Sequence, residues 1–547
     1  MRRPALALAS VTMLSLAAFV PGASALPSQE PPLRIAAQDI KWKRCFKTSP
    51  DPAFPEYTRL ECAKIKAPLD WKKPNGKKIT LAISRLKARK KPQGVIFTNP
   101  GGPGGAGRTL PLSLISAGRD RVLDTMDVIG VDVRGTGGGT KARCKTDPPV
   151  PTNTRDLSAG NAKAMLTWSK RMADSCRNGG GPLPAEYVTT AQTVHDLEWI
   201  RRNLETSDGK KVKKIHWIGY SNGTWLGAHY AKRWPKSTGR FVLDSAVDYT
   251  GTWQKWTDSQ PKGFWDRFRQ FARWAAGNNG QFGLGASEKA VLNTYEEIRA
   301  VIAKEGYVKL TYDDGSTQDL YPIDFDQIIW QSLYSKYSFI ETAGLMSALT
   351  ALTDGGQARA RTLPKALNAR PAAAIYGEGA VFYDVTCGDM KYSRTPKQQS
   401  SAAAKLGKKY PLIGYDLALN PCPYWKQASG RLKLARPAGN DLPGMLLVQS
   451  VYDPATPYGP ALKVHKRYAN SRMVTVRNEG DHALYAGDNP CVDTIVEQWL
   501  VDGVLPKADR TCQGTPIPDP AVAARTAGDG PVNPVLLARE LAERLPG

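Results

Sequence analysis

The sequence of 547 residues has few of the side chains and motifs from which metal, redox and nucleotide sites are built. It contains five histidines and eight cysteines but no C-x-x-C pair, which argues against zinc ribbons and thioredoxin-like redox motifs. No Gly-Lys-Ser/Thr follows a glycine-rich segment, so a phosphate-binding loop is not indicated, and Gly135–Gly139 lacks the G-x-G-x-x-G register of a dinucleotide site. We therefore expect neither a metal nor a cofactor.

Acidic residues are also scarce, because 50 Asp and Glu stand against 75 Lys and Arg and leave a formal net charge of +25. Such an excess is typical of nucleic-acid-binding proteins. However, the positive charges gather in Arg85–Lys91, Lys210–Lys214 and Lys463–Arg467 without interleaved aromatic residues, and no nucleic-acid-binding motif occurs. We interpret these stretches as solvated surface and expect no nucleic-acid partner. The alternative is electrostatic contact with anionic cell-wall polymers.

Only the N-terminus carries a long apolar run. Arg2 and Arg3 precede Ala5–Val20, and Ala23-Ser24-Ala25 forms a small-x-small cleavage site. The run is shorter than the roughly 20 residues that a membrane-spanning helix needs. The pattern predicts a signal peptide over residues 1–25 and a secreted, extracellular chain without a membrane span. A membrane anchor is the alternative interpretation.

Export changes what the cysteines indicate. Disulfides persist outside the cytoplasm, and an even number of cysteines favours complete pairing. Pairing between cysteines that are neighbours in the sequence predicts four bridges, Cys45–Cys62, Cys144–Cys176, Cys387–Cys422 and Cys491–Cys512.

Short apolar segments alternate with helical patterns in the first and last parts of the chain. The segments are Val95–Thr98, Val128–Val131, Ile215–Ile218, Phe241–Asp244, Met445–Gln449 and Met473–Val476. This alternation predicts an α/β fold with a parallel sheet covered on both faces.

The stretch 249–436 differs from its flanks, because it is rich in helix formers and aromatic residues. We expect a mostly helical insertion between two parts of the sheet. The predicted organisation is therefore a leader (1–25), a core in two parts (26–248 and 437–512), the insertion (249–436) and a C-terminal tail (513–547). A short amphipathic helix over Val535–Leu545 would close the tail.

One motif carries chemistry. Gly219-Tyr220-Ser221-Asn222-Gly223 matches G-x-S-x-G, and it follows the predicted strand Ile215–Ile218 and opens a predicted helix over Thr224–Trp234. A strand, a sharp turn and a helix are what a nucleophile elbow requires, and the glycines allow the strained turn. The Ser221 hydroxyl is expected at the carboxyl edge of the sheet, where open α/β folds place their sites.

A serine nucleophile needs a histidine base, and in this type of site the chain order is Ser, acid, His. His482 fits, because it follows the last predicted strand in the polar loop Asn478–His482. The other histidines fit poorly, since two precede the serine, one lies on the helix after it and one stands among basic residues; they are His195, His216, His229 and His465.

The acid that orients His482 should follow the preceding strand. Asp453 does so, in the loop Ser450–Pro457. Asp481 is the rival acid, but adjacent side chains rarely point at each other, so Asp453 is preferred.

Acyl transfer also needs an oxyanion hole. The backbone N–H of Asn222 is the expected first donor, since it follows the nucleophile. The second should come from the glycine-rich loop Asn99–Gly105, in which Gly102 is the best single candidate because glycine lets backbone approach a substrate oxygen.

With these residues in place, the chain resembles the secreted tripeptidyl aminopeptidases of actinomycetes, relatives of the prolyl aminopeptidases. The resemblance rests on five segments, Asn99–Gly105, Asp127–Gly137, Gly219–Gly227, Gln449–Tyr458 and Gly480–His482. It implies an α/β-hydrolase fold with a mostly helical lid inserted in the sheet. It further implies a secreted serine exopeptidase that releases short peptides, tripeptides by the family's name, from free N-termini of peptide or protein substrates.

In that family the lid closes one end of the site and recognises the free amine. A carboxylate is needed to hold the substrate ammonium. The predicted lid offers four acids, among which the sequence does not discriminate: Asp258, Asp266, Glu341 and Asp389. Two alternative functions remain open, a secreted carboxylesterase or lipase with the same triad and a non-catalytic cell-wall-binding protein on a hydrolase scaffold.

Overall fold

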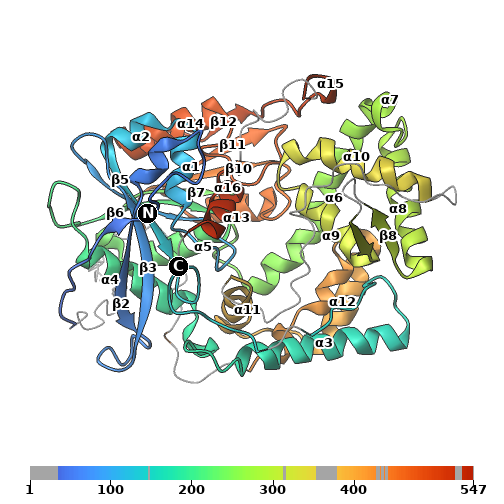
Figure 1. Ribbon diagram of the computed structural model, residues 1–547, viewed down its shortest axis with the longest axis horizontal. Helices are drawn as coiled ribbons and strands as arrows, with labels where there is room; N and C mark the ends of the chain where they lie inside the picture. The colour runs from blue at the N-terminus through green and yellow to red at the C-terminus, as the bar shows by residue number, and fades with distance from the viewer. Residues whose placement is uncertain are drawn as a thin grey trace, which may run out of the picture. The chain divides into compact units, whose positions relative to one another are not determined.

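Strands β4–β7 and β10–β12 run parallel in a ten-stranded sheet of the described part of the chain (Figure 1). The order is β1-β2-β3-β5-β4-β6-β7-β10-β11-β12, and β1–β3 pair antiparallel at one edge. The bounds are Lys43–Arg44 (β1), Glu61–Pro68 (β2), Lys78–Leu86 (β3), Gly94–Asn99 (β4), Met126–Asp132 (β5), Ile215–Tyr220 (β6), Thr238–Asp244 (β7), Met445–Ser450 (β10), Ser471–Arg477 (β11) and Arg510–Gln513 (β12).

The computed structural model describes residues 35–145, 148–311, 316–352, 378–426, 432, 437, 442–523 and 533–545. The predicted signal peptide over 1–25 lies outside these residues. Residues Ala37–Gly547 form one compact unit. No helix of the described residues combines the length and the apolar character needed to cross a bilayer.

Helices cover the sheet, which explains why the central strands β5 and β10 are buried along their whole length. All six residues of β10 and all seven of β5 are buried. Two-sided burial of this kind is typical of parallel sheets. The covering helices are Leu110–Ser116 (α1), Asp120–Thr125 (α2), Thr190–Asn203 (α4), Asn222–Arg233 (α5), Tyr458–Arg467 (α13) and Pro490–Glu497 (α14).

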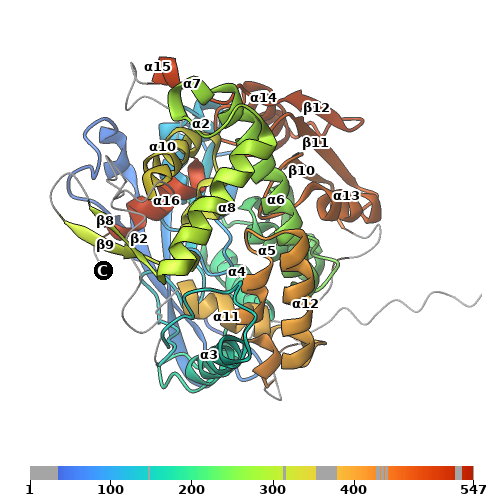
Figure 2. The same ribbon diagram turned by 90° about the vertical axis from the view of Figure 1, so that its right-hand side faces the viewer.

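A mostly helical region stands between β7 and β10, and we call its described elements α6 to η8 the lid (Figures 1 and 2). It has its own apolar core, in which Phe264, Phe268 and Phe271 of α6 pack with Tyr295 and Ile298 of α8. A hairpin of β8 and β9 interrupts the helices. The bounds are Trp253–Gly277 (α6), Asn279–Phe282 (α7), Glu288–Glu305 (α8), Val308–Thr311 (β8), Thr317–Leu320 (β9), Pro322–Ser332 (α9), Lys336–Ser338 (η4), Phe339–Leu349 (α10), Thr350–Leu352 (η5), Glu378–Gly388 (α11), Pro396–Lys409 (α12), Tyr415–Leu419 (η7) and Cys422–Tyr424 (η8).

Helix α3 (Ala159–Arg177) precedes the lid in sequence but packs against it. It lies beside α11 and α12 (Figure 2) and also contacts η7 and η8. Met165 of α3 shares an apolar cluster with Ala403 and Ala418. The wall of the lid is thus built from two distant parts of the chain.

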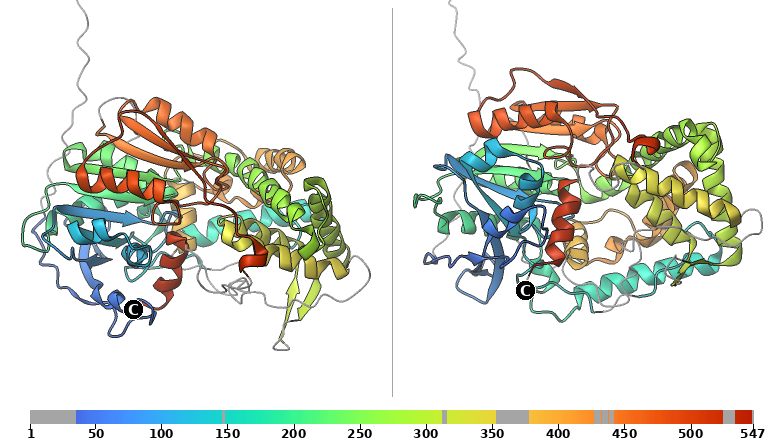
Figure 3. Two further views of the ribbon diagram at one scale, coloured as in Figure 1. Left: turned by 90° about the horizontal axis from the view of Figure 1, so that it is seen from above. Right: turned by 45° about the horizontal axis from the view of Figure 1, so that its top comes forward.

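The C-terminal tail returns to the core. Its last described helix, α16 (Pro534–Glu543, red in Figure 3), packs against α1. Thr109 Oγ1 donates a hydrogen bond to the carbonyl of Ala538. The amphipathic helix predicted over Val535–Leu545 is confirmed, with its start one residue earlier and its end two residues earlier. The short helix Pro520–Ala523 (α15) precedes it.

All eight cysteines pair as predicted from their order in the sequence. The bridges are Cys45–Cys62, Cys144–Cys176, Cys387–Cys422 and Cys491–Cys512. The bridge Cys387–Cys422 joins α11 to η8 within the lid.

Candidate active site

Ser221 lies on the sharp turn between β6 and α5. Its backbone has φ 54° and ψ −126°, a conformation that residues other than glycine adopt at a cost in free energy. The turn is also crowded, because a Cβ on Gly223 would lie 2.6 Å from the carbonyl oxygen of Asn99 at the end of β4. The elbow predicted from G-x-S-x-G therefore has the local geometry of that motif.

His482 and Asp453 meet through their side chains. The His482 Nδ1 atom lies 3.0 Å from each carboxylate oxygen of Asp453, and both residues are buried, with 4% and 1% exposure. Asp453 Oδ1 also accepts hydrogen bonds from the N–H groups of Ala455 (3.0 Å) and Thr456 (2.8 Å). These bonds fix the carboxylate, which in turn orients the imidazole.

Asp481, the rival acid, points elsewhere. Its carboxylate forms an ion pair with Arg267 of α6 and accepts a hydrogen bond from the Lys336 N–H (2.7 Å). Burial and the neighbouring Glu479 raise the pKa of Asp481 to about 7, against the opposing effects of Arg267 and Lys336. Asp481 therefore ties the His482 loop to the lid.

Lys336 adds a second bond between the lid and this loop. Its ammonium lies 2.8 Å from Glu479 Oε2 and 2.9 Å from Asp488 Oδ2, and the side chains of Lys336 and Glu479 are each 1% exposed. Glu479 Oε1 accepts hydrogen bonds from the N–H groups of Gly480 and Asp481. The residues just before His482 are thus held by a buried ion pair.

The residues just after His482 are held by the end of β7. Asp244 accepts hydrogen bonds from the N–H groups of Leu484 (3.0 Å) and Tyr485 (2.7 Å), and Ser245 Oγ accepts one from Ala483 (2.9 Å). Burial raises the pKa of Asp244 to about 7. No role was predicted for Asp244, although a carboxylate at the end of a buried strand is a signal that a sequence can show.

Two further residues contact His482 from distant parts of the chain. The Tyr334 carbonyl, in the lid, accepts a hydrogen bond from the His482 N–H (3.0 Å), and the Tyr334 ring packs edge-on at 5.2 Å. Asn533, just before α16, donates its side-chain N–H to the His482 carbonyl. Neither contact had a local signal in the sequence.

The glycine-rich loop lies directly against the elbow. Asn99 pairs with Gly219 in the register of β4 and β6, so the following Gly101 and Gly102 lie beside Ser221 and Asn222. A Cβ on Gly101 would lie 2.9 Å from the Asn222 nitrogen. Asn222 Nδ2 donates to the Gly102 carbonyl, whereas the backbone N–H groups of Gly102 and Asn222 make no hydrogen bond to other described residues.

The four predicted amine-binding acids have different surroundings. Asp258 forms a bidentate ion pair with Arg394 (2.7 and 2.8 Å), and Asp266 pairs with Lys262 at the surface. Asp389 accepts hydrogen bonds from Thr190 N (2.8 Å) and Trp253 Nε1 (3.1 Å). Burial raises the pKa of Glu341. None of the four lines the two cavities described next.

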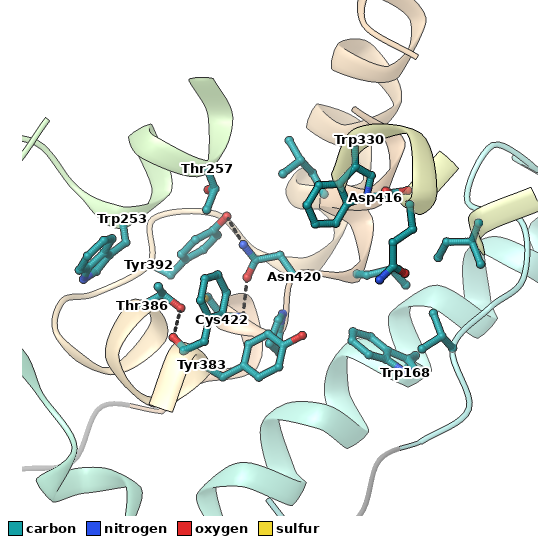
Figure 4. A pocket seen from close by; sticks show the side chains of 17 residues that line it. Trp168, Trp253, Thr257, Trp330, Tyr383, Thr386, Tyr392, Asp416, Asn420 and Cys422 are labelled. Atoms are coloured by element: carbon teal, nitrogen blue, oxygen red, sulfur yellow. Dashed lines mark hydrogen bonds between the residues drawn. The ribbon is translucent and has the colours of Figure 1, made fainter. Parts of the chain in front are cut away.

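A small cavity of about 30 Å³ adjoins the elbow, and a larger one of about 340 Å³ lies between the lid and helix α3. Gly101, Asn222, Trp225 and Trp253 contribute to the wall of the first. The second is lined mainly by aromatic and aliphatic side chains (Figure 4). Trp253 lines both cavities.

Two lid acids were not predicted from the sequence: Asp416, which is partly buried, and Asp384, which is buried. Asp416 lines the larger cavity and accepts a hydrogen bond from Thr154 Oγ1 (2.6 Å), and burial raises its pKa to about 7. Asp384 of α11 is enclosed by protein, its Oδ1 has no hydrogen-bond partner among the residues that the structure describes, and burial raises its pKa well above the usual range. Their burial depends on how the lid packs, for which the sequence carries no local signal.

Comparison with known proteins shows which families and chains this sequence is similar to. Residues 94–322 match the family model described as alpha/beta hydrolase fold, and residues 410–512 match the model described as TAP-like protein. A tripeptidyl aminopeptidase of Streptomyces lividans is 28% identical over 510 residues, covering 89% of each chain.

Two mycobacterial proteins are also similar. The serine protease Hip1 of Mycobacterium tuberculosis is 24% identical over 87% of this chain and 91% of its own length. Carboxylesterase B of the same species is 26% identical over 88% of this chain and 92% of its own length. The similar chains thus include both peptidases and an esterase.

Proposed function

We propose that this chain, a serine hydrolase of the α/β-hydrolase fold, uses Ser221, His482 and Asp453 as its catalytic triad. The observation that carries the proposal is the buried contact of His482 Nδ1 with both Asp453 oxygens at 3.0 Å. Asp453 holds the imidazole so that its Nε2 is the basic nitrogen. His482 then takes the proton of the Ser221 hydroxyl as the oxygen attacks the substrate carbonyl.

The N–H groups of Gly102 and Asn222 are the proposed oxyanion donors. Both are uncommitted within the described residues and belong to backbone segments that touch each other. Donors already fixed in place stabilise the charge that develops on the carbonyl oxygen of the tetrahedral intermediate. His482 then protonates the leaving amine, and water releases the acyl group from Ser221 by the reverse sequence.

The proposed substrates are peptides and proteins with free N-termini, from which the enzyme releases tripeptides. The similarity to a tripeptidyl aminopeptidase over 89% of both chains supports this substrate class. The lid supports it as well, because it contacts the His482 loop and contributes Trp253, Val381 and Val385 to the wall of the small cavity at the elbow.

Purified enzyme tests the proposal directly. We expect labelling by a fluorophosphonate, loss of labelling in Ser221→Ala, and a fall in kcat of about 10⁴–10⁶ in that variant. We further expect faster hydrolysis of tripeptide p-nitroanilides with free N-termini than of their acetylated counterparts or of di- and tetrapeptide analogues. Unchanged turnover in Ser221→Ala contradicts the triad.

A carboxylesterase is the second candidate, favoured by the similarity to carboxylesterase B over a comparable length. Hydrolysis of p-nitrophenyl esters without hydrolysis of any peptide anilide would support it. Absence of both activities and of fluorophosphonate labelling would instead support a non-catalytic role in binding the cell wall.

The proposed location is extracellular, and the basic surface suggests what the chain contacts there. Four disulfides support an extracellular location. Contact with anionic cell-wall polymers would use the basic stretches, but several of their members already have acidic neighbours, among them Lys210 with Asp208 and Lys463 with Asp248. Release from cell-wall preparations by salt supports such contact, and binding that salt does not change contradicts it.

A further inference from the structure

The side chain of Asn222 is buried but only half satisfied. The residue is 3% exposed. Its Nδ2 donates a hydrogen bond to the Gly102 carbonyl, whereas its Oδ1 is enclosed and accepts no hydrogen bond from the residues that the structure describes. A buried acceptor without a donor costs free energy, and native structures contain few such groups. The presence of an amide at this position therefore needs a reason other than stability.

The surroundings of Asn222 would suit an apolar side chain. Leucine has a similar volume and would leave no enclosed acceptor. Aromatic and aliphatic side chains line much of the small cavity that Asn222 borders, among them Trp225, Leu226, Trp253, Val381 and Val385. What asparagine supplies here and leucine would not is the hydrogen bond to Gly102.

The loop that receives this bond has few means of anchoring itself. Gly101, Gly102 and Gly104 have φ values of 95°, 109° and 104°, which glycine adopts freely. These residues carry no side chain that could pack against the core, and Gly102 is exposed. The position of the loop therefore depends on hydrogen bonds of its backbone.

Two hydrogen bonds from β4 and from the loop itself set the Gly101 peptide groups. The Gly101 N–H donates to Asn99 Oδ1 (3.0 Å), and the Gly101 carbonyl accepts from the Gly105 N–H (2.9 Å). Because the C=O and N–H of one planar peptide group point in opposite directions, the second bond also sets the direction of the Gly102 N–H. The bond from Asn222 is different, since it ties the loop to the elbow.

We propose that Asn222 is a positioning residue of the oxyanion hole, whose side-chain amide holds Gly102 where its N–H and that of Asn222 reach the same substrate oxygen. This role rests on the triad and the backbone donors proposed above. Fixed donors stabilise the transition state more than the bound substrate, because the negative charge on the oxygen develops only during the reaction. Loss of the amide should therefore reduce turnover and leave substrate binding intact.

The kinetic test compares Asn222→Leu with Asn470→Leu, in which the lost amide donates to the Leu442 carbonyl (2.9 Å) near the opposite edge of the sheet. The substrates are a tripeptide p-nitroanilide and p-nitrophenyl acetate, since hydrolysis of either passes through an oxyanion. We expect Asn222→Leu to lower kcat for the anilide and kcat/KM for the ester by about 30-fold, with KM for the anilide within about twofold. Asn470→Leu should leave both unchanged.

Two further variants keep the result interpretable. Asn222→Ala removes the amide without adding bulk and should reproduce the loss, so it serves if leucine disturbs folding. Asn222→Gln keeps an amide donor on a longer side chain and should recover at least about half of the loss on a logarithmic scale.

Inhibition by a tripeptide trifluoromethyl ketone separates positioning from binding. Ser221 Oγ adds to the ketone carbon, its proton passes to His482, and the carbonyl oxygen becomes an oxyanion that the hole must bind. The Ki of this ketone should rise about 30-fold in Asn222→Leu. The Kd of a tripeptide amide, measured by tryptophan fluorescence in a Ser221→Ala background, should stay within about twofold.

Thermal unfolding gives a readout of opposite expectation for a structural role. Water can replace the amide at the exposed Gly102 carbonyl, and leucine removes an unmatched acceptor, so Tm of Asn222→Leu should stay within about 1 °C of wild type. A residue needed only for packing would instead lower Tm together with kcat.

The outcomes separate this inference from the proposed function. If Ser221→Ala keeps full turnover, or wild type hydrolyses neither anilides nor esters, the proposed function is wrong and the role of Asn222 is wrong with it. If wild type hydrolyses esters only, the peptidase assignment is wrong and the ester kinetics still test Asn222. If the triad is confirmed but Asn222→Leu and Asn222→Ala both keep kcat within about threefold, or Ki and Kd rise in parallel, the positioning role is wrong.

Discussion

Replacing Lys336 by methionine would test whether the lid holds the catalytic loop. The Lys336 ammonium and the Glu479 carboxylate, 2.8 Å apart, are each 1% exposed. Removing one partner of a buried ion pair costs about 3–5 kcal/mol, because the other charge is left without compensation. The unfolding entropy of a chain of this size is about 1 kcal/mol/K, so the expected fall in Tm is about 3–5 °C.

Activity should fall together with stability, for a geometric reason. Glu479 holds the N–H groups of Gly480 and Asp481, which directly precede His482. A small displacement of the base reduces turnover strongly, so we expect kcat on a tripeptide p-nitroanilide to fall at least about tenfold with little change in KM.

The double variant Lys336→Met/Glu479→Gln provides the decisive comparison. It removes both charges, so it should be more stable than Lys336→Met alone, with a coupling energy above about 1 kcal/mol in a double-mutant cycle. Lys309→Met, at an exposed ion pair, should change stability by less than about 0.5 kcal/mol. A fall of under about 1 °C in Lys336→Met, or additive effects in the cycle, would refute the reasoning.

Three further predictions concern other contacts. Gly101→Ala would place a Cβ 2.6 Å from the Tyr220 carbonyl oxygen at a φ of 95°, so kcat should fall at least about tenfold. The control Gly118→Ala, with φ 63° and no atom within 4 Å of the added Cβ, should lower the free energy of unfolding by about 1 kcal/mol and leave kcat unchanged. Steady-state kinetics and thermal unfolding measure both effects. Asn533→Ala removes the donor to the His482 carbonyl and should lower Tm by about 1 °C and reduce kcat, and unchanged kcat would show that the bond does not position the base. Burial raises the pKa of Asp416 to about 7, so the folded state holds its proton more tightly than the unfolded state. Its contribution to stability is therefore complete below about pH 4 and declines as the pH rises to about 7, and Asp416→Asn should reduce this decline in Tm–pH curves, while an unchanged slope would contradict it.

The parts of the site that depend on local chain geometry could be predicted from the sequence. The elbow is encoded in five consecutive residues, because the flanking glycines permit the turn that places Ser221 after β6. Asp453 follows β10 and His482 follows β11, and these neighbouring parallel strands end at the same edge of the sheet. The sequence therefore predicted that Asp453 contacts His482, and in the structure His482 Nδ1 lies 3.0 Å from the Asp453 carboxylate.

The parts that depend on tertiary packing could not be predicted. Asp244 reaches Tyr485 across 241 positions, and Asn533 reaches His482 across 51. The carboxylate of Asp416 becomes part of a cavity only because α3 packs against the lid. Contacts between residues so far apart in the chain leave no periodic pattern or characteristic spacing in a single sequence.

The contact between Asn533 and His482 has a consequence for when the chain becomes active. The proposed base is held by the sheet, by the lid and by the residue that opens α16, so its loop is complete only after the C-terminal helix has docked on α1. A polypeptide still emerging from the ribosome lacks that helix in place. Full positioning of the proposed base is therefore expected only once α16 has been synthesised and has docked on α1.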